Sequence, residues 1–393
     1  MLWLIWLTGC LLFFSIFLNG LATWRAWSFI KRRSAPQKSL LSKPPVTLLI
    51  PVCGVEGTEG ERVEHFLRFS QLDWPQYQVI FTVLKDSDPA VPLLQQILSS
   101  PTCTVNLQMG GIATGANPKV RNLLNALPLV RHEWIVICDA DVKPEPSFLE
   151  GLMAPFLESD ASYSSRIEQD SHVGLVHSLY RCLEDTTLAS SWEHVWVNCD
   201  FWAQGLLGDW LRGTNFAFGA TMAFHRNTLE QIGGLESIQD YLADDYQLGN
   251  RVAKLGKDLI FNREFVTLQS TPQSWSETWQ HLLRWSRTIR VCQPGGFATS
   301  IVTNITLFAF LALFVDRTLF LPWSMGAFIL RVWWANQCRN WITGRQGLWN
   351  RCWLIPFKDL AQAVLWVLAF WNGPVEWRGV RYKLGSDGKL RIS

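Results

Sequence analysis

Charged residues are scarce in this sequence. Its 393 residues include 35 Lys and Arg against 33 Asp and Glu, which gives a formal net charge of +2 and a charged fraction of only 17%. That is too little charge for an unstructured polyelectrolyte, and too little positive charge for the broad basic face of a nucleic-acid-binding protein. We therefore expect a folded chain with no nucleic-acid partner.

Two kinds of motif are also missing. None of the nine Cys residues forms a CxxC pair or has the spacing of a zinc finger, and several lie inside apolar runs. This is typical of buried, reduced thiols in a protein that faces the cytosol. The glycine-rich stretch 110–119 (GGIATGANPK) lacks the GxxxxGK[ST] spacing, which excludes a Walker-type phosphate loop.

Tryptophan, by contrast, is abundant. The 22 Trp residues outnumber Tyr and Met together, and 48% of all residues are hydrophobic. Indole rings favour bilayer interfaces and the surfaces that bind sugars or lipids. The mean hydropathy is nevertheless only +0.09. A channel-like helical bundle would be more hydrophobic, so the composition indicates a water-soluble domain joined to a few membrane segments.

The first apolar segment, residues 2–21, is long enough to cross a bilayer, and basic residues follow it at Arg25, Lys31, Arg32 and Arg33. It lacks the preceding positive charge and the small-residue cleavage site of a secretory signal. The sequence therefore predicts an N-terminal anchor (1–30), followed by a polar linker (31–45). Because positive charge marks the inner side, we expect an integral membrane protein whose following domain faces the cytosol.

Three further apolar segments lie near the other end. Residues 298–315 and 319–335 predict a membrane hairpin. The third, 353–371, is interrupted near its start by Lys358 and Asp359, and a full crossing would put the basic tail outside. We therefore expect a re-entrant or interfacial segment there. This gives a membrane region over 297–373 and a basic tail over 374–393.

The domain between these parts, residues 46–296, alternates two kinds of pattern. Short apolar runs of strand length are followed by stretches with apolar residues three and four apart. The runs are 46–52, 78–84, 105–109 and 133–138, and the helical stretches are 63–72, 92–99 and 119–130. This alternation predicts an α/β fold with a parallel sheet, whose ligands bind beyond the carboxyl ends of the strands.

A DxD motif follows the last of these strands. Asp139 and Asp141 are hard oxygen donors of the kind that Mg²⁺ and Mn²⁺ prefer, and a cation held there can also hold a diphosphate. The alternative is that Asp is common after strands as a turn or cap former. Asp86 and Asp88 follow the second strand, where KDSDP also reads as a simple turn. Lys119, at a helix start, is placed to reach a pyrophosphate.

Two later patterns have equally simple alternatives. Asp244 and Asp245 precede a helical stretch and are candidates either for catalysis or for capping that helix. His281, Arg284 and Trp285 lie on a Trp-rich helical stretch just before the membrane segments, where an interfacial helix with snorkelling Arg would look the same. Taken together and in this order, the acidic motifs and the RW pair are far more specific than any one alone.

The whole set resembles the membrane-anchored family-two-like glycosyltransferases, and most closely the ceramide glucosyltransferase family with its bacterial hopanoid glycosyltransferase relatives. The resemblance covers about residues 45–297 and extends to the flanking membrane segments. Further matches are Asp88-Pro89-Ala90, Asn117-Pro118-Lys119 with Asn122, Ile137-Cys138-Asp139, Gly174-Leu175-Val176-His177, Gly233-Gly234-Leu235 and Ala243-Asp244-Asp245-Tyr246.

The resemblance implies a GT-A, Rossmann-like fold for a nucleotide sugar. On the donor side it implies that Asp86 or Asp88 faces the uridine and that Asp141 of the DxD holds a divalent metal. It also implies that Asp245 is the catalytic base. Arg284 and Trp285 would belong to the family's (Q/R)xxRW motif. The expected donor site comprises Asp86, Asp88, Lys119, Asp139, Asp244 and His281. Two positions depart from the family: His281 replaces Gln or Arg, and the doublet is Asp-Asp instead of Glu-Asp.

Chemistry supports the same assignment. Mn²⁺ or Mg²⁺ on Asp139 and Asp141, assisted by Lys119 or Arg284, would neutralise the leaving diphosphate of a UDP-sugar. One carboxylate, Asp245, is sufficient to deprotonate the acceptor hydroxyl in a single displacement with inversion, which gives a β-glycoside from an α-linked donor.

The Trp-rich stretch 188–210 suits a helix in the headgroup region and therefore favours a membrane lipid as acceptor. The alternative is that its rings pack against the sheet and the hairpin. Three other functions stay open: an N-acetylglucosamine-transferring hopanoid enzyme, a processive polysaccharide synthase, for which the membrane segments look too few, and an inactive membrane scaffold. The sequence does not distinguish glucose from N-acetylglucosamine.

Overall fold

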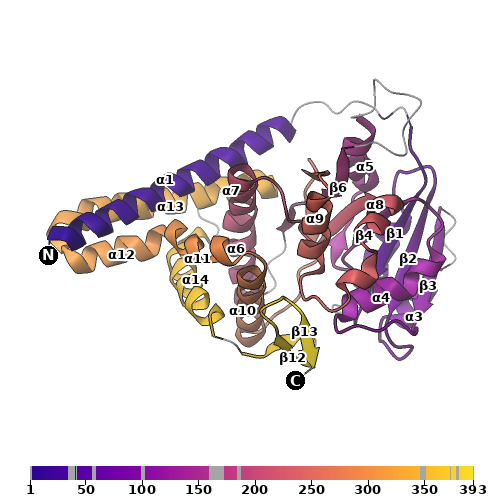
Figure 1. Cartoon of the computed structure of the whole chain (residues 1–393). Helices are drawn as coiled ribbons and strands as arrows, with labels where there is room; N and C mark the ends of the chain where they lie inside the picture. Colours follow the sequence, from indigo (N-terminus) through magenta and orange to yellow (C-terminus); the bar gives the residue numbers. More distant parts are fainter. Residues whose placement is uncertain are drawn as a thin grey trace.

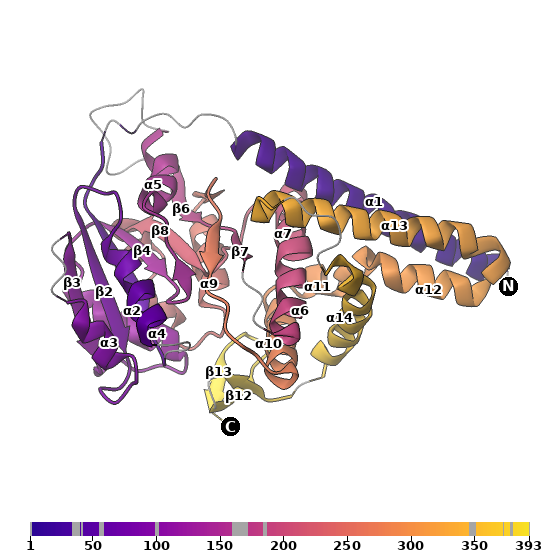
Figure 2. The same ribbon diagram turned by 180° about the vertical axis from the view of Figure 1, so that it is seen from behind.

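A computed structural model describes residues 2–33, 40, 42–54, 59–98, 102–158, 172–183, 187–345, 351–371, 373–377 and 380–392. An α/β domain forms one side of the molecule and long helices form the other (Figure 1). The N-terminus lies at the tip of the helices, far from the sheet, and the C-terminal segment folds back between the two parts (Figure 2).

The central sheet has seven strands in the order β3-β2-β1-β4-β8-β6-β9. The four predicted strands are confirmed, and they pair in parallel as the β3-β2-β1-β4 half of the sheet. β8 runs antiparallel to both of its neighbours, so the sheet is mixed and not wholly parallel. The bounds are β1 (Val46–Pro51), β2 (Tyr77–Val83), β3 (Thr104–Met109), β4 (Trp134–Cys138), β6 (Val173–His177), β8 (Thr221–His225) and β9 (Asp258–Phe261).

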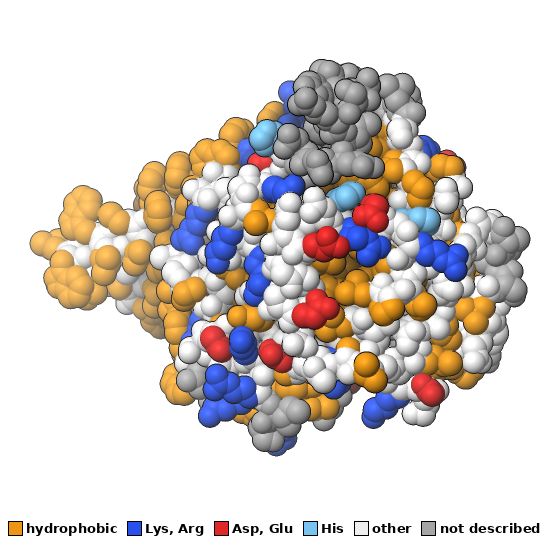
Figure 3. Space-filling model, turned by 45° about the vertical axis from the view of Figure 1, so that its right-hand side comes forward, with side chains coloured by type: hydrophobic (Ala, Val, Ile, Leu, Met, Phe, Trp, Pro, Cys, Tyr) orange, Lys and Arg blue, Asp and Glu red, His pale blue; other side chains and the backbone are white. Residues whose placement is uncertain are grey.

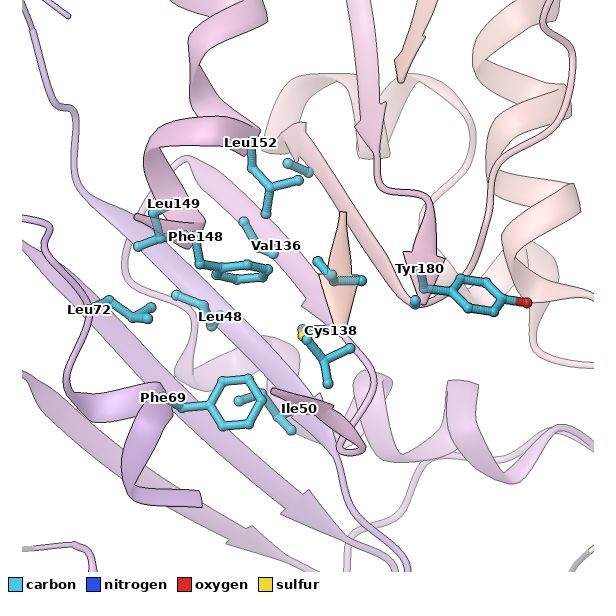
Figure 4. Close-up of a cluster of buried hydrophobic side chains, with 14 of the residues drawn as sticks. Leu48, Ile50, Phe69, Leu72, Val136, Cys138, Phe148, Leu149, Leu152 and Tyr180 are labelled. Carbon is cyan, nitrogen blue, oxygen red and sulfur yellow. The ribbon is translucent and has the colours of Figure 1, made fainter. Parts of the chain in front are cut away.

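Helices cover both faces of this sheet, because alternate strand residues point to opposite sides. Leu48 and Ile50 of β1 belong to the core beneath α2 (Glu59–Leu67), α3 (Val91–Gln96) and α5 (Phe148–Glu158), part of which Figure 4 shows. Leu49, between them, belongs to the core beneath α4 (Pro118–Ala126), α8 (Arg226–Gln231) and α9 (Asp244–Lys254). Both cores bury apolar runs that the sequence marks as strands.

Two small sheets extend the domain. One combines β5 (Val142–Lys143), β10 (Val266–Leu268) and β7 (Tyr180–Cys182) beside the end of β4. The other lies within the stretch expected to be only a basic tail and consists of β11 (Val375–Trp377), β12 (Val380–Leu384) and β13 (Leu390–Ile392). It folds because Val375, Tyr382 and Leu390 bury their side chains against Leu242. Arg381 and Lys383, which alternate with these buried residues, are exposed and hide the apolar pattern in the sequence.

The helical side of the molecule carries the apolar segments. The long helices are α1 (Leu2–Arg33), α12 (Ile305–Val315) and α13 (Arg317–Thr343), with α11 (Pro294–Ser300) and α14 (Ile355–Ala369) beside them. Leu2–Arg33 and Cys352–Ala369 are long and apolar enough to cross a membrane, and Pro294–Thr303 with Ile305–Val315, bent by 57°, could form a third span. The helices α1, α12 and α13 project from the rest of the molecule, and the side of them seen in Figure 3 carries mostly hydrophobic side chains.

Four buried charges join the two parts of the molecule. Arg331 of α13 lies 2.7 Å from Asp200 and 2.8 Å from Asp359. Lys358, next to Asp359 on α14, contacts the same two carboxylates. Asp200 lies in a π-helical segment, Val197–Phe201, between α6 (Leu188–Trp196) and α7 (Trp202–Arg212). Lys358 and Asp359, which suggested an interfacial segment, are thus buried partners, while the topology of 353–371 stays a prediction.

Removing one member of this cluster should destabilise the fold. Arg331→Met leaves two buried carboxylates with one cation, which should lower the free energy of unfolding by about 3–5 kcal/mol. Thermal unfolding of the detergent-solubilised protein measures this. Arg317→Met, at an exposed position of the same helix, is the matched control and should have little effect. Equal losses in the two variants would contradict the inference that the cluster holds the two parts together.

Candidate active site

Lys119 is the central cation at the carboxyl edge of the sheet. Its position is set by the start of α4, where the Asn117 side chain accepts hydrogen bonds from the backbone N–H groups of Lys119 and Val120, and Pro118 occupies the first helical position. The Lys119 Nζ lies 2.7 Å from Asp139 Oδ1 and 3.2 Å from Asp244 Oδ2. The predicted helix start is therefore confirmed, and the structure brings these three predicted residues into direct contact.

These contacts decide the charge of Lys119. Burial alone would lower the pKa of the ammonium group, but the negative charges of Asp139 and Asp244 outweigh it and raise that pKa. Lys119 therefore stays cationic at neutral pH. Asp139 and Asp141 stand where β4 leaves the sheet: Asp139 is half-exposed and Asp141 exposed. Both carboxylates of the DxD thus remain accessible to solvent at the end of β4.

Asp245 lies beside this cluster at the first turn of α9. The N-cap of this helix is Ala243, so neither carboxylate of the Asp244-Asp245 doublet serves as the N-cap. Asp244 instead binds Lys119. Asp245 Oδ1 accepts a hydrogen bond from Tyr246 N at 2.7 Å. Burial, followed by the negative charge of Asp244, raises the pKa of Asp245 to about 7, although Lys119 opposes the shift. A carboxyl group with this pKa can exchange a proton at neutral pH.

Gly219 fixes the space next to Asp245. A Cβ at Gly219 would lie 2.9 Å from Asp245 Oδ2, which is closer than real Cβ contacts come. The preceding residue, Phe218, donates its backbone N–H to His177 Nδ1 at 3.0 Å. Burial lowers the pKa of His177 to about 3, so this imidazole is neutral and its Nδ1 accepts the hydrogen bond from the Phe218 backbone. The loop before β8 is thereby held against the Asp245 carboxylate.

Asp86 and Asp88 follow the end of β2, and among the described residues backbone N–H groups bind Asp88 but not Asp86. Asp88 accepts hydrogen bonds from Gly54 N, at 3.0 and 3.1 Å, and from Ala90 N, at 2.9 Å, so it ties the loop after β1 to the start of α3. Gly54 has φ +68°, a backbone conformation that favours glycine. Asp86 is exposed beside Gly110. The geometry thus gives Asp88 a structural task and leaves Asp86 accessible at the edge.

The remaining predicted residues lie on α10 (Trp275–Cys292), which forms the opposite side of the site. The ring of Trp285 contacts those of Trp196, at 5.0 Å between centroids, and Phe201, at 5.7 Å. His281 packs on Trp285 at 4.4 Å. The Arg284 guanidinium lies over Trp377 of β11, so the C-terminal sheet also contacts this motif.

The Trp-rich stretch 188–210 is one helical run, α6, the π-helix and α7, and its rings have different environments. Trp202 is fully buried in the core against Phe265, as the alternative interpretation expected. Trp210 contacts Trp24 of α1. Trp196 packs on Trp285.

The sequence patterns did not reveal two residues of this region, Glu193 and Gly219. Glu193 pairs with His281. The only signal for Glu193 was its place among the Trp residues of this stretch.

Comparison with solved structures defines the class of protein. The mannosyltransferase PcManGT from Pyrobaculum calidifontis, solved in complex with GDP-Man and Mn²⁺, matches 94% of this chain and 99% of its own length at 16% identity, with a TM-score of 0.53. A likeness at this identity shows the fold alone. The fold is that of a GT-A glycosyltransferase, which confirms the predicted fold class.

The family follows from the sequence profile of Glycosyl transferase family 21, which matches residues 7–390. The chain belongs to this family, the ceramide glucosyltransferase family, so the resemblance is confirmed. Ceramide glucosyltransferase 3 of Caenorhabditis elegans is 22% identical over 250 residues, covering 62% of this chain and 50% of the relative. Ceramide glucosyltransferase 1 of the same organism is 19% identical over 364 residues, covering 89% and 74%. The chain thus spans half the length of the first relative.

Substituting Gly219 should impair glycosyl transfer through Asp245. The Cβ of Gly219→Ala would lie 2.9 Å from Asp245 Oδ2 and displace the carboxylate that the sequence predicts as the base, so we expect kcat/KM to fall by up to about 100-fold. Gly208→Ala is the matched control, because no atom lies within 4 Å of its added Cβ. Steady-state kinetics of both variants, with thermal unfolding to show that they fold, test this. Equal activity of the two would refute a tight fit around Asp245.

Proposed function

We propose that this glycosyltransferase transfers a hexose, with glucose favoured, from a UDP-sugar to a hydroxyl group of a ceramide-like or hopanoid-like membrane lipid, with inversion to a β-glycoside. The observation that carries the proposal is Asp245, a carboxyl group with a pKa of about 7 beside the Lys119, Asp139 and Asp244 cluster at the carboxyl edge of a GT-A sheet. Membership of family 21 and the two ceramide glucosyltransferase relatives support the acceptor class.

The donor side consists of the groups after β2 and β4. Asp86 is the accessible carboxylate for the uridine, and Lys119 supplies a fixed positive charge for the diphosphate. Asp139 and Asp141 would hold a divalent cation, because both are oxygen donors that remain accessible at the end of β4. Among the described residues no group of three or more acidic, His or Cys side chains is gathered for a metal, so the diphosphate would complete the coordination.

That cation, Mn²⁺ or Mg²⁺, would neutralise the leaving diphosphate, and the Mn²⁺ in the solved mannosyltransferase supports its use here. On the acceptor side, the lipid hydroxyl oxygen attacks the anomeric carbon while the bond from that carbon to the diphosphate breaks. The proton passes to Asp245. One carboxylate is enough for this single displacement, which inverts the anomeric centre.

The membrane side of the site supports a lipid acceptor. α6 and α10 carry exposed apolar side chains at their first residues, Leu188 at 50% and Trp275 at 51% exposure. The two helices also contact each other through aromatic rings: Trp192 of α6 and Trp275 of α10 have 5.7 Å between their ring centroids. A lipid leaving the bilayer would encounter these helices before it reached Asp245. We further propose that the catalytic domain faces the cytosol, since Lys31, Arg32 and Arg33 end α1 on the side of the α/β domain.

Labelled donors test the proposal directly. Membranes containing the protein, given labelled UDP-glucose or UDP-N-acetylglucosamine in separate reactions, should place the label in a lipid, with UDP-glucose as the better donor. Asp245→Asn should abolish the transfer and leave UDP-sugar binding largely intact. Label in a long water-soluble polymer would indicate a polysaccharide synthase instead, and no labelled lipid with either donor would overturn the proposal.

The pH dependence of kcat/KM should report the Asp245 carboxyl group. The base must be deprotonated to accept a proton, so activity should fall as the pH drops through about 7. Asp244→Asn removes a negative charge that raises this pKa, and frees Lys119 from one partner, so the acid limb should move to lower pH. Pre-steady-state or steady-state rates of both proteins between pH 5 and 9 give the two pH–rate profiles. If the acid limb of the Asp244→Asn profile stays in place or moves to higher pH, Asp245 is not the titrating base.

A further inference from the structure

Glu193 of α6 is a buried carboxylate that is only half satisfied. Its Oε1 lies 3.1 Å from His281 Nδ1 of α10, within range for an Nδ1–H group to donate. Its Oε2 is buried and has no hydrogen-bond partner among the described residues. The residue is 9% exposed. An acceptor oxygen buried without a donor is unfavourable, and nearly all buried polar atoms in folded proteins have a partner, so this oxygen is open to a donor from outside the described residues.

The electrostatic surroundings keep this group ionised. Burial would raise the pKa of Glu193, but His281, then His194 and Arg284, lower it overall. The Glu193 carboxylate therefore accepts hydrogen bonds and does not donate them. This also gives a task to His281, which replaces the Gln or Arg of the family motif: it holds one oxygen of Glu193 in place.

A continuous run of aromatic rings joins this pair to the catalytic base. His281 packs on Trp285, and Trp285 on Phe201. Phe201 packs on Phe218 at 4.9 Å, and Phe218 precedes Gly219, the residue in contact with Asp245. Glu193 and His281 therefore lie at one end of an aromatic wall, formed by Trp285, Phe201 and Phe218, whose other end adjoins Asp245.

Tyr180 lies close enough to Glu193, Asp245 and Asp141 for all three charges to affect its hydroxyl group. Its ring contacts Phe201 at 5.5 Å, and after burial and Cys182 the charges of Glu193, Asp245 and Asp141 all raise its pKa. Its hydroxyl points away from the hydrophobic core (Figure 4). Tyr180, Phe201 and Trp285 are thus neighbouring rings that lie between Glu193 and the carboxylates Asp141 and Asp245.

We propose that Glu193 Oε2 accepts a hydrogen bond from a second donor group on the lipid acceptor, a hydroxyl or an amide N–H near the hydroxyl that attacks the sugar. This inference rests on the proposed function and narrows it to lipid alcohols that carry such a second donor. A lipid with a single hydroxyl leaves Oε2 unpaired in the complex, so the enzyme discriminates against it. The hydrogen bond to Glu193 of α6, which His281 of α10 positions, thus selects the acceptor. The aromatic wall holds the apolar part of the lipid.

The test compares two acceptors of equal chain length in mixed micelles with full-length protein: an N-acyl amino alcohol, which has the second donor, and a simple fatty alcohol, which lacks it. Wild-type protein should prefer the first. Glu193→Gln should lower kcat/KM for the first lipid by about tenfold or more, through a raised KM, with the KM for the UDP-sugar unchanged. The rate with the fatty alcohol should stay the same, so the preference shrinks.

Two further variants keep the result interpretable. Glu230→Gln, at an exposed position of α8, should retain the wild-type preference. Glu193→Asp, which keeps the charge and shortens the side chain, should give an intermediate preference. An equal fall with both lipids, or no change with either, would overturn the role of Glu193. Failure of the wild-type protein to glycosylate any lipid would instead overturn the proposed function itself, and this outcome is visible before any variant is compared.

Discussion

The arrangement of the site depends on the ammonium group of Lys119. It binds the carboxylate at the end of β4 and the carboxylate at the start of α9, two elements that are 105 residues apart when counted from Asp139 to Asp244. Without this cation, Asp139, Asp244 and Asp245 would gather three negative charges at one edge of the sheet. Lys119 therefore permits the cluster to form, while burial and Asp244 still hold the pKa of Asp245 near neutrality.

A second constraint links this site to the membrane helices. Asp200, paired with Arg331 and Lys358, lies in the same π-helical segment as Phe201, whose ring stacks on Trp285. π-helical segments are rare and occur frequently at functional sites. The neighbouring residues of one short segment thus face the ion cluster on one side and the RW motif on the other. The position of the bundle and the position of α10 are set together.

Sequence patterns were sufficient where the physical cause is local. The strand runs, the helix start at Asn117-Pro118-Lys119 and the N-terminal apolar helix are all confirmed, because each depends on neighbouring residues. Patterns failed where the cause is a distant partner. Glu193 acquires its significance from His281, and the C-terminal sheet folds because Leu242 receives its apolar residues. The individual roles of the DxD, Asp245 and Arg284 stay predictions, while the structure brings Lys119, Asp139 and Asp244 into contact.

Two carboxylates of this site have pKa values displaced in opposite directions, and the difference suits two different tasks. Asp245 is buried next to another carboxylate, so its charged form is disfavoured and its pKa rises to about 7. Glu193 is buried next to His281 and near Arg284, so its charged form is favoured and its pKa falls. A group of the first kind takes up and releases a proton during turnover, whereas one of the second kind remains a permanent hydrogen-bond acceptor. Burial is common to both, so the sign of the neighbouring charge decides which carboxylate has a raised pKa and which one stays ionised.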